Sequence, residues 1–239
     1  MGLGVGAAAA KQRFASGLAR VTLFELYTSE GCSSCPPAER WLGELRGAPG
    51  LWRDFVPVAR HVDYWNRLGW PDRFSTKGIT ARQYALVAAW SSGSVYTPCF
   101  VRDGAEWRTG KSFLLKNAGG EAAGGLVGVL DASGRGRVEF APGSGAGGAF
   151  SAQVAVLGGG FIPKVTAGEN RGETLGREFV VLAVAESRLE PGASGGAWQA
   201  EFELPKPKIN DGARRALAVW VTRRGELAPL QATGGWLER

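Results

Sequence analysis

The stretch Val21-Thr-Leu-Phe-Glu-Leu-Tyr-Thr-Ser-Glu-Gly-Cys-Ser-Ser-Cys-Pro-Pro37 decides the expected fold. Its first seven residues are mostly apolar, β-branched or aromatic, which is typical of a β-strand. Two successive prolines are tolerated in a helix only in its first turn, where their missing N–H groups would have no partner anyway. We therefore expect a strand over 21–27, a turn that carries Cys32 and Cys35, and a helix over 36–47.

The following segments continue the alternation of strand and helix. The pair Asp103-Gly104 favours a two-residue hairpin between two of them. The predicted elements are a strand over 55–62, a helix over 76–91, strands over 94–101 and 106–109, and a short helix over 111–119. This order, strand-helix-strand-helix followed by a hairpin and a helix, is that of the thioredoxin core.

The composition changes near Gly119, where glycine-rich turns begin to separate short strands with alternating hydrophobicity. Strands are predicted over 136–140, 150–157, 178–185, 197–204 and 215–221, with a hairpin at Asp211-Gly212. We therefore expect an α/β fold class. A thioredoxin-like N-terminal domain over 20–120 is followed by an all-β, antiparallel, sandwich-like C-terminal domain over 121–239.

Composition narrows the class of protein. The net charge of +6 over 239 residues is moderate, and the basic residues are scattered rather than grouped, so nucleic acid is not expected as a partner. No apolar stretch is long enough to span a membrane. The apolar start, Met1 to Ala10, has no basic region ahead of it, so a complete signal peptide is not visible.

The pair Cys32 and Cys35 has a physical reason to be reactive. A helix N-terminus offers the positive end of the macrodipole and unpaired N–H groups, both of which favour a thiolate. The spacing puts the two sulfurs within reach of a disulfide bond and leaves Cys32 the more exposed. We expect Cys32 to be the attacking nucleophile and Cys35 the resolving thiol.

Two further segments are expected close to Cys32 and Cys35, at the edge of the sheet where the parallel strands end and where open α/β sheets bind ligands. Thr97 and Pro98 would return there, with the bond between them cis. Tyr64 and Trp65 would form an aromatic rim for a peptide, or pack in the core. Asp63 is a proton shuttle, a ligand, or only the cap of the next turn.

Three more residues could take part. Burial in an apolar strand would raise the pKa of Glu25 and suit it to proton transfer near Cys35, unless a salt bridge holds it. His61, the one histidine, is a structural residue or a ligand. Cys32, Cys35, Cys99 and His61 together would suit Cu(I), which prefers soft ligands.

The motif around the two cysteines, with His61-Val-Asp-Tyr-Trp65, Ser94-Val-Tyr-Thr-Pro98 and Gly168-Glu-Asn-Arg-Gly-Glu-Thr-Leu175, resembles a bacterial secreted family. It is the domain of unknown function catalogued as twelve twenty-three, and the resemblance runs through both halves of the chain. The resemblance implies a thioredoxin-like fold and an exported protein, periplasmic or secreted. Because a complete signal peptide is not visible in this chain, the cytoplasm is the alternative. It supplies no reaction. Cys99 stands where the family usually has a polar residue.

Three functions follow from these observations. The first is a thiol–disulfide oxidoreductase that acts on protein or small-molecule disulfides, needs no cofactor, and draws electrons from a donor protein. The second is a protein that binds Cu(I) or another soft metal. The third is an interaction module in which the dithiol is structural.

Overall fold

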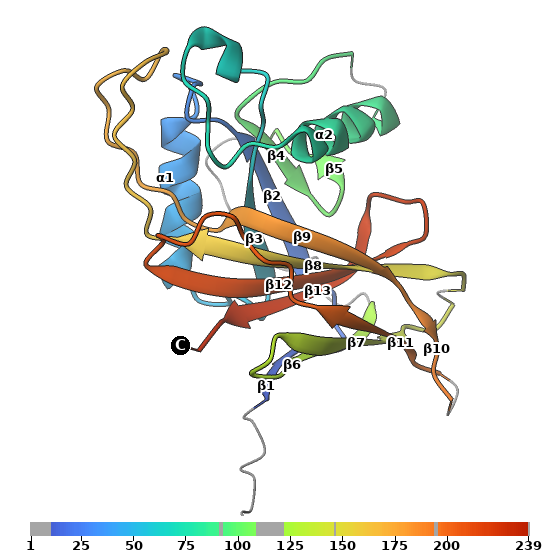
Figure 1. Ribbon diagram of the computed structural model, residues 1–239. Coiled ribbons are helices and arrows are strands. Elements are labelled where there is room, and N and C mark those ends of the chain that lie inside the picture. The colour runs from blue at the N-terminus through green and yellow to red at the C-terminus, as the bar shows by residue number, and fades with distance from the viewer. Residues whose placement is uncertain (1–10, 91–92, 109–121, 146, 194–195, 239) are drawn as a thin grey trace, which may run out of the picture.

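The computed structural model describes residues 11–90, 93–108, 122–145, 147–193 and 196–238, and two β-sheets dominate it (Figure 1). A five-stranded sheet has the order β1-β6-β7-β11-β10, and an eight-stranded sheet has the order β13-β12-β8-β9-β3-β2-β4-β5. The strands are β1 (Gln12–Ala15), β2 (Thr22–Thr28), β3 (Phe55–His61), β4 (Cys99–Arg102), β5 (Ala105–Glu106), β6 (Gly124–Leu130), β7 (Arg135–Pro142), β8 (Phe150–Gly159), β9 (Val180–Arg188), β10 (Glu190–Pro191), β11 (Trp198–Glu203), β12 (Arg214–Arg223) and β13 (Pro229–Trp236).

Two α-helices lie in the described part of the chain, α1 (Pro36–Glu44) and α2 (Lys77–Ala89), and they cover opposite faces of β2. Phe24 packs on Trp41 of α1 with ring centroids 5.4 Å apart, whereas the next side chain, Glu25, meets Arg82 of α2. Successive side chains of a strand point to opposite faces, which explains the division. The helix α2 begins where Thr76 Oγ1 accepts a hydrogen bond from the Ile79 amide at 3.2 Å.

The pairing around β2 follows the sequence prediction. β2 and β3 are parallel, and β4 is antiparallel to β2 with Tyr27 opposite Cys99. Asp103 and Gly104 turn β4 into β5 with φ values of 50° and 83°, the left-handed conformation that this pair favours in a hairpin.

The predicted fold class is wrong. A thioredoxin-like α/β domain followed by a separate sandwich is not present, because β3 pairs in parallel with β9 at Ala59 and Val180 and the same sheet runs on through β8, β12 and β13. The protein is mostly β. Every residue of β3 is buried, so the strand is covered on both faces. Its sequence does not indicate which strand lies beside it.

The predicted boundary between 20–120 and 121–239 falls within residues 109–121, which lie outside the described part, as does the predicted helix over 111–119. Strands from both sides of this boundary share the eight-stranded sheet. The hairpin predicted at Asp211-Gly212 is wrong, because β11 pairs with β7 in the smaller sheet and β12 pairs with β8 in the larger.

A hydrophobic core lies between the two sheets. Phe140 of β7 meets Phe150 of β8 edge to face, with ring centroids 5.2 Å apart. Leu126 and Val219 are buried in the same cluster.

Among the described helices, none is long and apolar enough to cross a membrane.

Gln231 of β13 ties distant segments together inside this core. Its side chain is fully buried, and Oε1 accepts the Val21 amide at 2.7 Å. Nε2 donates to the carbonyls of Ala19 and Gly124 at 2.9 and 2.8 Å. One amide therefore satisfies backbone groups from both halves of the chain.

Gln231→Ala should lower the free energy of unfolding by about 2–4 kcal/mol, because it leaves buried backbone groups without partners. Urea unfolding measures this cost. Gln199→Ala, on the half-buried strand β11, is the matched control and should cost about 1 kcal/mol or less. An equal cost for the two variants would contradict this role of Gln231.

Candidate functional site

Cys32 and Cys35 are joined in a disulfide bond in the turn between β2 and α1, with their Cα atoms 5.4 Å apart. Both residues are fully buried, whereas Ser33 and Ser34 between them are exposed. The expectation that Cys32 is the more exposed of the two is therefore wrong for the disulfide form. A partner must displace a covering group to reach either sulfur.

The start of α1 lacks the free N–H groups that the sequence suggested. Cys35 is the N-cap residue, and Pro36 and Pro37, which have no N–H, occupy the first two helical positions. The next amide, of Ala38, already bonds the Cys35 carbonyl at 3.0 Å. Stabilisation of a thiolate at this helix end therefore depends on the macrodipole.

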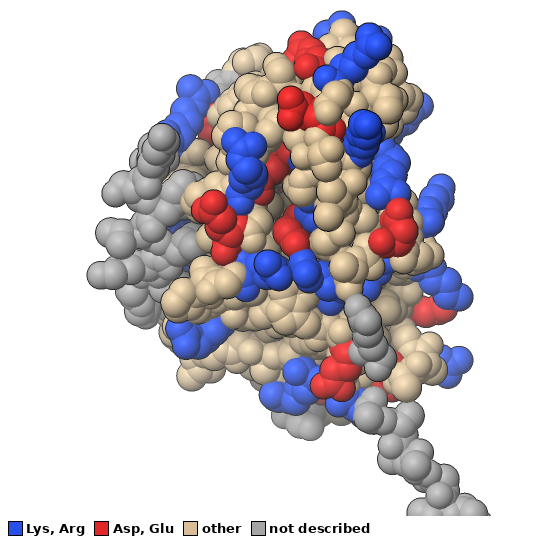
Figure 2. Space-filling model, turned by 90° about the vertical axis from the view of Figure 1, so that its left-hand side faces the viewer, with Lys and Arg blue, Asp and Glu red and all other residues tan. Residues whose placement is uncertain are grey.

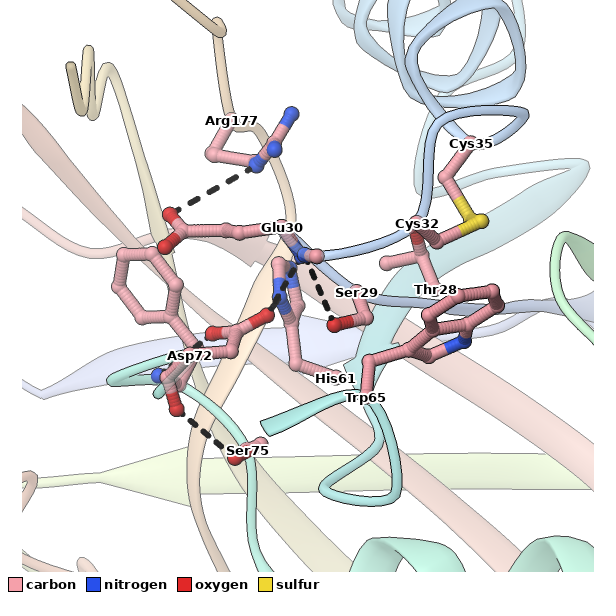
Figure 3. Close-up of polar contacts among 12 residues, drawn as sticks. Thr28, Ser29, Glu30, Cys32, Cys35, His61, Trp65, Asp72, Ser75 and Arg177 are labelled. Atoms are coloured by element: carbon pink, nitrogen blue, oxygen red, sulfur yellow. Dashed lines mark hydrogen bonds and ion pairs between the residues drawn. A yellow bond between two sulfur atoms is a disulfide. The ribbon is translucent and has the colours of Figure 1, made fainter. Parts of the chain in front are cut away.

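Trp65 and Thr97 lie together beside the disulfide, as expected. The Trp65 indole Nε1 donates to Thr97 Oγ1 at 2.8 Å, and Figure 3 shows the Trp65 ring next to the two sulfurs. Trp65 approaches the turn so closely that its Cβ lies 3.2 Å from where a Cβ on Gly31 would be. This close approach explains the glycine before Cys32.

The Thr97–Pro98 peptide bond is cis, which confirms that prediction. Pro98 lines an open hollow of about 440 Å³ together with Tyr96, Phe100, Trp107 and Arg108. The hollow offers aromatic walls next to the segment that carries Thr97.

Asp63 and Tyr64 are held by α2. Asp63 Oδ1 accepts a hydrogen bond from Thr80 Oγ1 at 2.6 Å, whereas the N-cap of the next turn is Trp65, so this bond is not the predicted cap. The Tyr64 hydroxyl donates to Gln83 Oε1 at 3.2 Å, and burial raises the pKa of Tyr64 to about 12. Both side chains are thus hydrogen-bonded to α2.

Glu25 is salt-bridged. Its carboxylate contacts Arg60 at 2.5 Å and Arg82 at 3.2 Å, on the face of β2 opposite α1. Burial alone would raise the pKa of Glu25, but Arg82 and Arg60 outweigh it and hold the pKa below its ordinary value. The expected rise in pKa is therefore wrong, because two cations share this carboxylate.

The four residues of the Cu(I) alternative do not form one site. Cys99 is buried in the cluster of Tyr27 and Val62, and burial raises the pKa of its thiol to about 11. Within the described residues, no group of three or more His, Cys, Asp or Glu side chains is arranged to hold a metal ion. The geometry therefore gives the Cu(I) alternative no support.

A cluster of buried charges lies on the other side of the 29–32 turn (Figure 3). His61 at the end of β3 is bonded through Nδ1 to Asp72 Oδ2 at 2.6 Å, and the same oxygen accepts the Glu30 amide at 2.8 Å. Arg177 is hydrogen-bonded to Glu39 of α1, whose other oxygen accepts from Thr28 Oγ1 at 2.7 Å.

The protonation states in this cluster are shifted. Burial raises the pKa values of Glu30 and Glu39 above their ordinary value. Burial alone would lower the pKa of His61, but the Asp72 carboxylate raises it, and the His61 cation in turn keeps the pKa of Asp72 below its ordinary value. His61 and Asp72 thus form a charged pair, while burial makes Glu30 and Glu39 harder to ionise than ordinary glutamates.

The segment 161–177 between β8 and β9, here called the strap, covers the same turn (Figure 1). Asn170 is buried, and its Nδ2 donates to the carbonyls of Glu30 and Cys32, both at 2.8 Å. Glu169 Oε2 accepts from the Ser33 hydroxyl at 2.7 Å and from the Ser33 amide at 3.1 Å. The C-terminal half of the chain therefore contacts the dithiol turn directly.

Several of these residues escaped the sequence analysis. Glu39 follows Cys35 by four positions in a predicted helix, a spacing that puts both on one face and could have indicated it. Asp72 and Arg177 carry no local signal, because only the strap and the 66–75 loop bring them to the turn. Asn170 lies in the motif Gly168 to Leu175, but the motif does not indicate that this residue contacts the turn.

On the face shown in Figure 2, Lys and Arg side chains are interspersed with Asp and Glu. A nucleic-acid surface usually gathers positive charge into a patch or stripe. The absence of a nucleic-acid partner stays a prediction.

Comparison with known proteins gives one family and two similar folds. The family model described as Protein of unknown function (DUF1223) matches residues 23–222. A crystal structure of a protein from Agrobacterium tumefaciens is similar, at 26% identity and a TM-score of 0.61, over 92% of this chain and 98% of that one. HBP35 of Porphyromonas gingivalis shares the fold at a TM-score of 0.64, with 12% identity over 93% of this chain and 76% of that one. No curated protein sequence matches significantly.

Asp72→Asn should lower the free energy of unfolding by about 3–5 kcal/mol, because it leaves the buried His61 cation without its partner. The raised pKa of His61 makes its contribution complete below pH 6.5 and lost as the pH rises through the folded-state value. The lowered pKa of Asp72 makes its contribution complete above pH 3.8 and lost on acidification. The cost should therefore be largest between these two pH values.

Denaturant unfolding at several pH values measures this cost. The control is Asp211→Asn, which breaks an exposed pair with Arg73 and should cost far less, because solvent screens that pair. A cost for Asp72→Asn that stays constant from pH 4 to pH 9 would contradict the assignment of a charged pair.

Proposed function

This chain belongs to the family described as Protein of unknown function (DUF1223), and we propose that it carries out thiol–disulfide exchange through Cys32 and Cys35. One observation carries the proposal: the two cysteines form a disulfide at the start of α1, beside the Trp65–Thr97 pair and within a turn that buried carboxyl groups flank. Substrates would be disulfides or thiols of proteins or small molecules.

The exchange has two steps. The Cys32 thiolate attacks one sulfur of a substrate disulfide, forms a mixed disulfide and releases the other substrate sulfur as a thiolate. The Cys35 thiolate then attacks the Cys32 sulfur, forms the Cys32–Cys35 disulfide and releases the second substrate thiolate. Two electrons pass to the substrate, and its two sulfurs take up the two protons that the cysteines gave up. A dithiol protein or a small thiol reverses these steps and restores the reduced pair.

The buried carboxyl groups support this chemistry. Exchange takes protons from two thiols and gives them to two others, so a group that holds a proton near neutral pH is useful. Glu30 lies two residues before Cys32 in the same turn, and burial raises its pKa. It also lines a cleft with Trp70 and Arg73.

The hollow beside Pro98 supports a peptide as the partner. Aromatic side chains and Arg108 line it, and the Thr97 segment joins it to the dithiol turn. A disulfide bond persists in oxidising compartments, so the proposed location is the periplasm or the extracellular space.

Cys35→Ser should accumulate a mixed disulfide at Cys32, because the resolving thiol is gone. Cys32→Ser should trap no more than about a tenth as much, because Cys35 serves as N-cap and comes second in the exchange. Incubation of the reduced variants with oxidised glutathione, followed by intact-protein mass spectrometry, measures the adducts.

Cys99→Ala in both variants is the control for the third thiol, and it should leave the result unchanged because Cys99 is fully buried. Equal trapping by the two variants would remove the proposed order of attack. Absence of any adduct on either variant would refute the exchange activity and favour a structural disulfide.

A further inference from the structure

The strap is fixed to the dithiol turn by a buried side chain. Asn170 uses both of its amide hydrogens on the Glu30 and Cys32 carbonyls, and it is 5% exposed. Arg177 at the end of the strap is hydrogen-bonded to Glu39 of α1 and is 3% exposed. These two contacts hold the strap against the residues that precede and follow the disulfide.

Glu169, the residue before Asn170, places a carboxylate on the turn itself. Its Oε2 accepts two hydrogen bonds from Ser33, the residue that follows Cys32. The Ser33 amide is thereby used by a carboxylate and is withdrawn from a thiolate on Cys32. Pro36 and Pro37 contribute no N–H groups either, so backbone donors are scarce around this sulfur, and its described hydrogen-bond contact is the Ser34 hydroxyl at 3.3 Å.

A negative charge and a shortage of donors act in the same direction. Both make the Cys32 thiolate less stable, while they leave the uncharged disulfide largely unaffected. A dithiol whose reduced form is destabilised has a lower reduction potential and gives up its electrons more readily. The opposite arrangement, a stabilised thiolate, makes a strong oxidant.

Building on the proposed function, we propose that Glu169 is a positioning residue that biases the Cys32–Cys35 pair toward the disulfide, so that the protein acts as an electron donor to substrate disulfides. The substrate is reduced by two electrons as the dithiol closes to the disulfide. A dithiol donor protein or a low-molecular-weight thiol supplies the electrons for the next cycle.

Other charged groups also face this turn. They are Glu30 of the turn, Glu39 of α1, His61 of β3, Asp72 of the 66–75 loop and Arg177 of the strap. All of them are buried and remain unchanged when Glu169 is substituted. A comparison of variants at position 169 therefore isolates the effect of its carboxylate.

Glu169→Gln tests the inference, because glutamine can still accept from Ser33 but carries no charge. The matched control is Glu173→Gln, which removes an exposed carboxylate from the same strap. Two quantities are measured on the full-length protein: the pKa of Cys32, from the pH dependence of iodoacetamide alkylation, and the equilibrium constant for reduction by glutathione. Cys99 does not interfere near neutral pH, since burial raises its pKa to about 11.

Glu169→Gln should increase the acid dissociation constant of Cys32 about threefold, the order of effect that a nearby unit charge has in water-like surroundings. Above the pKa of Cys32, where the reduced protein carries the thiolate, the equilibrium constant for reduction by glutathione should rise by about the same factor. Glu173→Gln should change neither quantity. Asn170→Ala should move both in the same direction as Glu169→Gln, because it releases the strap.

If Glu169→Gln behaves like Glu173→Gln, the inference is overturned while the exchange activity stands. Failure of the wild-type disulfide to equilibrate with glutathione would refute the proposed function itself. The two failures are therefore distinguishable in one set of titrations.

Discussion

The buried ion pair between Arg177 and Glu39 is the constraint on which the site depends. Both side chains are buried, and a charge removed from water is tolerated only when a partner and hydrogen bonds compensate for its lost hydration. Arg177 enters from the segment before β9, and Glu39 belongs to the helix that begins at Cys35. Satisfying this pair therefore fixes the strap and α1 relative to each other. Asn170 and Glu169 reach the dithiol turn because the strap is held at this point.

The shared eight-stranded sheet gives this pair its rigid base. β9 pairs with β3 at Ala59 and Val180, and the strap leaves the sheet just before that contact. The turn that carries the dithiol leaves the neighbouring strand, β2. The disulfide and the segment that covers it thus emerge from adjacent strands of one sheet, although more than 130 residues separate Ser33 from Glu169 in the sequence. The C-terminal half is therefore part of the site.

Local signals predicted the elements around Cys32 and Cys35 well, since the strand, the proline-started helix α1 and the Asp103-Gly104 turn all depend on neighbouring residues. The fold class was mispredicted because the pairing of β3 with β9 is set by long-range contacts that a fully buried strand does not reveal. β6 and β13 were missed because their glycines, such as Gly128 and Gly234, suggest turns. A Cβ placed on Gly128 would lie 3.3 Å from a Val219 methyl group, so close packing explains this glycine. The charge cluster was missed because its members meet only in the folded chain.

Full burial of both sulfurs makes the central claim, that this disulfide is an exchange site, directly testable. The most direct measurement is the rate at which dithiothreitol reduces the Cys32–Cys35 disulfide in the native protein, compared with the rate of global unfolding under the same conditions. Our account predicts reduction much faster than unfolding, at a rate that rises with dithiothreitol concentration, because only the groups that cover the turn must move. Reduction that is limited by global unfolding would show that the disulfide is structural and would contradict the account.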